Sequence, residues 1–137
     1  MTFEKFGNEK NKTIFFIEGM ATTAHSCFDK ILPYLADFYV IYCNLDGHYD
    51  GSASFKSIEE ECCKIENYVN EELEGKLFAL LGFSLGGTIA VEIMSRRKIK
   101  IEITILDAAF CVKMGFLTGM YTKAMLWAIK RICSGKK

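Results

Sequence analysis

A serine between glycines is the residue of this sequence whose setting best suits nucleophilic chemistry. Ser84 lies in Gly82-Phe83-Ser84-Leu85-Gly86, after an apolar run and before a segment with helical spacing. This Gly-x-Ser-x-Gly spacing is typical of a nucleophile elbow, a sharp strand-to-helix turn that presents the serine hydroxyl. The pattern predicts a nucleophile at Ser84. The alternative is a glycine turn in which the serine only caps the helix.

The two glycines of this motif have a steric reason. A turn this sharp brings the positions two before and two after the serine against other backbone, where only a hydrogen atom has room. The Ser84 hydroxyl then lies near the start of the following helix. Free N–H groups and the helix dipole favour negative charge there.

The elements that must position this turn are short apolar strands. Four runs rich in β-branched and aromatic residues are predicted to be buried strands, because each is short and most end at turn-forming residues. They cover residues 13–17, 38–43, 76–81 and 99–106.

Segments with helical spacing separate the strands. Residues 58–73 carry one apolar stripe, and Ser57 with Glu60 forms a capping-box signature at its start. A weaker helix is expected over residues 28–35, bent or ended near Pro33. A further helix is expected after Ser84, with its apolar face made by Ile89, Ile93 and Met94.

This alternation predicts an α/β fold with three layers: a mostly parallel sheet covered by helices on both faces. Function in such sheets lies beyond the carboxyl ends of the strands. The loops to inspect are therefore residues 18–26, 44–54, 82–86 and those from 107 onward.

Composition limits the kinds of protein that this chain can be. At 137 residues, half of them apolar, it is long enough for one domain with a core and too short for two. The six cysteines come without an export signal, so we expect reduced thiols in a cytoplasmic protein. Their spacing is not that of a zinc site. We expect no metal, no cofactor and no nucleic-acid partner.

The charges are unevenly distributed, because every residue after Asp107 that carries a charge is basic. Residues 113–137 are read as a basic amphipathic helical segment, too short and too interrupted by Lys123 to span a bilayer. Peripheral contact with a membrane surface or an acidic partner is one interpretation. The preferred one is a helix whose acidic neighbours lie elsewhere.

The order of these landmarks resembles the α/β-hydrolase family. The matching stretches are Glu18-Gly19 at the end of an early strand, Asp46-Gly47-His48 after the next, GFSLGG at the elbow, and Asp107 after a further strand.

The resemblance implies acyl transfer on a small-molecule ester or thioester. Ser84 would attack the carbonyl carbon, and the backbone N–H groups of Leu85 and Met20 would hold the oxygen as it becomes negative. Asp107 is the candidate acid of a catalytic triad, and His25 is a candidate substrate contact.

The sequence departs from the family pattern in two places. The family's triad histidine comes late in the chain, whereas both histidines here precede Ser84, and His48 matches a turn histidine that organises a loop. Glu18 replaces the family's histidine before glycine. Its carboxylate either points away, is paired, or weakens catalysis by opposing the developing charge.

The resemblance also implies that the chain is incomplete. Residues 1–112 match the N-terminal part of a hydrolase domain, and residues 113–137 match the start of a cap. If the chain ends at Lys137, the strand over residues 99–106 becomes an apolar edge through which copies could associate. The favoured function is a serine hydrolase of esterase, lipase or thioesterase type. The alternatives are a non-catalytic relic or binding module and, as an outsider, a membrane-surface protein.

Overall fold

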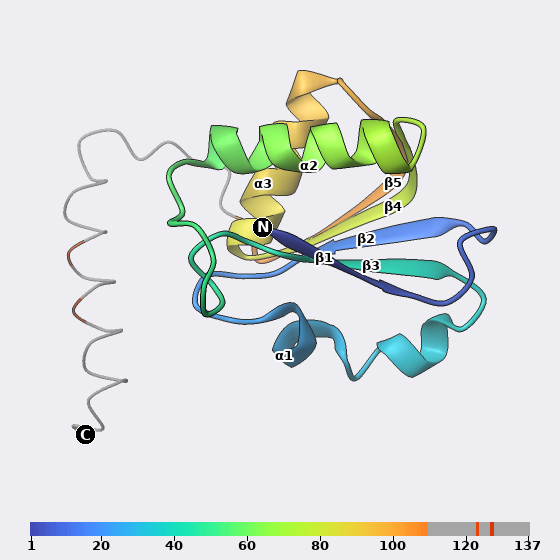
Figure 1. The fold of residues 1–137 in the computed structure, drawn as a ribbon, viewed down its shortest axis with the longest axis horizontal. Coiled ribbons are helices and arrows are strands. Elements are labelled where there is room, and N and C mark those ends of the chain that lie inside the picture. The colour runs from blue at the N-terminus through green and yellow to red at the C-terminus, as the bar shows by residue number, and fades with distance from the viewer. Residues whose placement is uncertain (110–122, 124–126, 128–137) are drawn as a thin grey trace.

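The computed structural model describes residues 1–109 together with residues 123 and 127. A five-stranded sheet has α2 and α3 on one face and α1 on the other (Figure 1). The strands are β1 (Thr2–Phe6), β2 (Thr13–Ile17), β3 (Tyr39–Asn44), β4 (Lys76–Phe83) and β5 (Lys100–Asp107). The helices are α1 (Ala24–Phe28), the 3₁₀ turn η1 (Leu32–Leu35), α2 (Ile58–Glu72) and α3 (Leu85–Arg96).

The sheet is mostly parallel, and its strand order is β1-β3-β2-β4-β5. Strand β2 pairs in parallel with both β3 and β4, and β4 pairs in parallel with β5. Only β1 runs antiparallel, on the outer side of β3. The predicted three-layer α/β architecture is confirmed, and the carboxyl ends of β2 to β5 meet at one edge of the sheet.

Strand β1 was not among the predicted elements. It lies at the edge of the sheet, so its charged residues Glu4 and Lys5 remain at least partly exposed. Phe3 and Phe6 pack against the apolar clusters on opposite faces. Such a strand lacks the continuous apolar run by which buried parallel strands are recognised.

Two apolar clusters hold the layers together. One contains Phe15, Ile17 and Leu80 of the sheet together with Ile65 of α2 and Ile89 of α3. The other lies beneath α1 and η1 and is built around aromatic rings from β2, β3 and α1. Every residue of β3 is buried, as expected for a central strand covered on both faces.

The helix expected over residues 28–35 is instead two short elements. The Thr23 side chain accepts a hydrogen bond from the Ser26 N–H, and the Ser26 Oγ accepts one from the Thr23 N–H, so α1 begins before Phe28. Pro33 lies at the start of η1, where its missing N–H removes no helical bond. The predicted extent was therefore wrong, whereas the expected interruption falls between α1 and η1, just before Pro33.

The N-terminus of α2 agrees with half of the predicted capping box. The Ser57 Oγ accepts from the Glu60 N–H at 3.1 Å. The Glu60 carboxylate does not return to the Ser57 backbone; it pairs with Lys56 at 3.3 Å and Lys64 at 3.1 Å. Ser57 is therefore the cap, and Glu60 belongs to the surface ion pairs of α2.

Replacing Ser57 with alanine is expected to lower the free energy of unfolding by about 1 kcal/mol, because the Glu60 N–H loses its acceptor. Urea denaturation followed by circular dichroism measures this loss. Ser54→Ala, at an exposed loop position, is the control and is expected to leave stability unchanged. Equal stability of the two variants would contradict the assignment of the cap.

The outer side of β5 is unpaired among the residues that the structure describes. Ile103, Ile105 and Leu106 are each more than 40% exposed there, in agreement with the predicted apolar edge. In the same part of the chain, no helix is long and apolar enough to cross a membrane. The boundary at residue 112 and the basic segment 113–137 lie outside the described residues, apart from Lys123 and Trp127.

Candidate active site

Ser84 alone makes the turn between β4 and α3. Its backbone has φ 52° and ψ −109°, a combination that residues with a side chain rarely adopt. The Ser84 N–H donates to the Asp107 carbonyl at 2.7 Å, which ties the turn to the end of β5. The turn therefore holds a strained backbone in place, as functional sites often do.

Gly82 and Gly86 lie so close to neighbouring backbone atoms that only glycine fits at either position. A methyl carbon placed on Gly82 would lie 2.6 Å from the Gly87 nitrogen, and one placed on Gly86 would lie 2.5 Å from the Glu18 carbonyl oxygen. Real Cβ atoms essentially never come this near to other heavy atoms. The steric role predicted for both glycines is confirmed.

The Ser84 hydroxyl is half-buried and does not cap α3. Within the described residues no hydrogen-bond partner is found for it. The Thr88 N–H instead bonds the Ser84 carbonyl, closing the first turn of the helix at 3.1 Å. The alternative of a purely capping serine is therefore wrong. The hydroxyl lies beside the N-terminus of α3.

The loop after β2 lies against this turn. A methyl carbon placed on Gly19 would lie 2.7 Å from the ring of Phe83, so the backbone of Gly19 passes close over that side chain. The Thr22 hydroxyl donates to the Gly19 carbonyl at 2.8 Å, which folds the loop back on itself. Met20, the predicted oxyanion donor, follows Gly19 directly, and this residue is 57% exposed.

Asp107 is placed beside the elbow, and His25 is not. Asp107 is in register with Phe83, and its exposed side chain ends β5 at the same edge as Ser84. His25 lies on α1, across the sheet from α3 (Figure 1). Its Nε2 lies 2.8 Å from Glu4 and its Nδ1 2.9 Å from Asp29. Hydrogen bonds to these two carboxylates raise the pKa of His25.

Glu18 and His48 form a pair that the sequence analysis did not foresee. The Glu18 side chain is fully buried, and its Oε1 accepts from the Leu45 N–H at 2.9 Å and from His48 Nδ1 at 2.9 Å. Burial raises the pKa of Glu18, although the Leu45 N–H and His48 oppose the shift. Of the alternatives left open for Glu18, the structure supports pairing.

A second group of charges holds the loop after β3 against α2. Buried Asp46 lies 2.6 Å from Lys64 Nζ and also contacts the amino group of Met1. Buried Glu61 accepts from the Asp46 N–H at 3.2 Å and pairs with Lys64. Although burial opposes ionisation, these cations lower the pKa of Asp46. The position of His48, two residues after Asp46, is therefore well defined.

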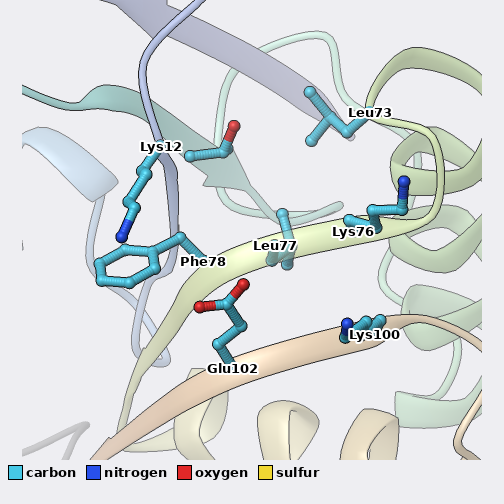
Figure 2. A pocket seen from close by; sticks show the side chains of 8 residues that line it. Lys12, Leu73, Lys76, Leu77, Phe78, Lys100 and Glu102 are labelled. Atoms are coloured by element: carbon cyan, nitrogen blue, oxygen red, sulfur yellow. The ribbon is translucent and has the colours of Figure 1, made fainter.

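A charged hollow lies at the opposite edge of the sheet from Ser84. Figure 2 shows Lys12, Lys76, Lys100 and Glu102 around it, near the amino ends of β2, β4 and β5. Phe78 lies beneath the Lys12 ammonium group, which is 4.4 Å from the ring centre. In the described part of the chain, no group of three metal-ligating side chains is assembled.

Solved structures of similar shape include several hydrolases. A protein assigned to the α/β-hydrolase family from Desulfitobacterium hafniense aligns with a TM-score of 0.88 and 27% identity, over 98% of this chain and 55% of that one. A structure from a study of carboxylesterases of Nitrososphaera gargenis aligns with a TM-score of 0.72 and 16% identity, over 91% of this chain and 48% of that one. MenH from S. aureus aligns with a TM-score of 0.73 and 16% identity, over 90% of this chain and 48% of that one.

The chain thus spans about half the length of these structures. Neither a protein-family model nor a curated protein matches the sequence.

Proposed function

Because the chain has an α/β-hydrolase fold, we propose that it acts as a serine hydrolase in which Ser84 attacks a carboxylic ester or thioester. The observation that carries the proposal is the strained backbone of Ser84, with a hydroxyl that no described residue bonds. A strained residue persists only where its surroundings force it, and such residues cluster at active sites.

The proposed reaction is acyl transfer. The Ser84 Oγ forms a bond to the carbonyl carbon, the alcohol or thiol leaves, and water then hydrolyses the acyl-serine. Leu85 is the first residue of α3, so its N–H has no acceptor within the helix and is free to bind the oxyanion. The Met20 N–H is the second proposed donor. One such donor contributes about 3 kcal/mol to stabilising the transition state.

Asp107 is the proposed triad acid, because it ends the strand next to the elbow. Neither histidine of the sequence is bonded to Ser84: both ring nitrogens of His25 face carboxylates, and His48 Nδ1 faces Glu18. This observation favours a second candidate function, a binding module that holds a ligand at the elbow without turnover. Contact of His25 with substrate remains a prediction.

Ester turnover distinguishes the two functions. Wild-type protein is expected to hydrolyse p-nitrophenyl acetate, p-nitrophenyl butyrate or an acyl thioester at least about 100-fold faster than Ser84→Ala, because the variant lacks the nucleophile. Ser54→Ala, at an exposed serine, is the matched control and should keep the wild-type rate. Equal rates for wild type and Ser84→Ala would contradict the hydrolase. Binding of a substrate without turnover would favour the binding module.

A further inference from the structure

The buried pair of Glu18 and His48 takes no part in the proposed reaction, yet it adjoins the proposed oxyanion donor. Glu18 is separated from Met20 by Gly19 alone. We propose that the Glu18–His48 pair is a positioning device that fixes the Met20 N–H relative to Ser84. This inference rests on the proposed function of Ser84 as a nucleophile.

The side chain of Glu18 is anchored to the loop after β3. Both hydrogen bonds of its Oε1, from the Leu45 N–H and from His48 Nδ1, are 2.9 Å long. The Glu18 side chain is 0% exposed and that of His48 is 11% exposed, so water competes little for these bonds. A hydrogen bond to a charged group is stronger than one between neutral groups. The end of β2 is thereby fastened to the end of β3.

The main chain of Glu18 is fixed from the other side by the elbow. Its carbonyl oxygen is 2.5 Å from where a methyl carbon on Gly86 would lie, so it packs directly on the first turn of α3. Gly19 packs on Phe83 in the same way. The peptide that leads to Met20 is thus held between β3 on one side and the elbow on the other.

Burying a carboxylate here is costly, which argues against a role in packing alone. Glu18 Oε2 makes no hydrogen bond of normal geometry in the described part of the chain, although the Ala24 N–H helps to stabilise the charge of the carboxylate. An apolar side chain of similar volume would fill the space at lower cost. Only a polar group, however, can bond the Leu45 N–H and His48 together. Because oxyanion donors act only when correctly oriented, fixing this loop favours the reaction of Ser84.

Two variants of His48 test the inference. His48→Phe keeps a ring but loses the Nδ1 donor, whereas the amide of His48→Asn can donate from nearly the same position. His48→Phe is expected to shift the NMR resonance of the Met20 amide and to speed hydrogen exchange of the Leu45 amide, which donates to Glu18 Oε1, about 10-fold or more. His48→Asn should restore both. Exchange of the Val69 amide, on the buried face of the last turn of α2, should be unchanged in both variants.

The rate at which a fluorophosphonate labels Ser84 is measured on the same samples. His48→Phe is expected to label about 10-fold more slowly than wild type, and His48→Asn to recover most of the rate.

An unlabelled wild type would refute the proposed function, while the Met20 amide would still report on positioning. An unchanged Met20 resonance together with unchanged labelling in His48→Phe would overturn the positioning role. So would equal acceleration of exchange at Leu45 and Val69, which indicates general destabilisation. If His48→Phe does not fold, Glu18→Gln is used in its place, because it weakens the same pair while keeping the shape of the side chain. The same results then support or overturn the positioning role.

Discussion

Replacing Gly86 with alanine is expected to lower the free energy of unfolding by about 3 kcal/mol. The new methyl carbon would lie 2.5 Å from the Glu18 carbonyl oxygen and would also overlap the Ile17 carbonyl. Both are backbone atoms at the buried end of a central strand, so neither can rotate away as a flexible side chain would. Urea denaturation of the variant and wild type measures the loss.

Gly51→Ala is the matched control, because it introduces strain from a positive φ without a steric clash. Gly51 has φ +80° and no atom within 4 Å of an added methyl carbon. Its replacement is expected to cost about 1 kcal/mol, from the positive φ alone. If Gly86→Ala is at least as stable as Gly51→Ala, the elbow does not pack as closely on the loop after β2 as described.

The Ser84→Gly variant is expected to have a free energy of unfolding at least about 1 kcal/mol higher than that of Ser84→Ala. The φ of 52° and ψ of −109° strain any residue that carries a Cβ atom, and glycine adopts such angles readily. Alanine keeps the Cβ atom and therefore the strain. Both variants lose the hydroxyl, so the difference in stability reports on the backbone alone.

The same pair of substitutions at Ser95 provides the control. Ser95 is exposed and lies in the last turn of α3, where glycine is expected to be less stable than alanine. The order of stability at Ser84 should therefore be the reverse of that at Ser95. The same order at both positions would contradict the strained elbow and remove the main support for Ser84 as a nucleophile.

The elbow could be predicted from sequence because its requirements are local. The glycine spacing, the apolar run of β4 and the helical period after Ser84 all lie within 20 residues. Strands β2 to β5 were found for a similar reason, since buried parallel strands are short continuous apolar runs. The apolar stripe of α2 likewise follows from spacing alone.

The Glu18–His48 pair could not be predicted, because it depends on tertiary structure. The two residues are 30 positions apart, and only the parallel pairing of β2 with β3 brings their loops together. The sequence placed both at the carboxyl edge of the sheet without indicating their contact. For the same reason the contact of His25 with Glu4 of β1 could not be foreseen, whereas Asp29 lies only four residues after His25.

Covalent labelling tests the nucleophilic role of Ser84 most directly. Folded wild-type protein is treated with a fluorophosphonate, and the adduct is counted by intact mass and located by peptide mapping. We expect one adduct per chain on the peptide that contains Ser84, none on Ser84→Ala, and full labelling of Ser54→Ala. Folded wild type without an adduct, or an adduct that persists in Ser84→Ala, would contradict the assignment of Ser84 as the nucleophile.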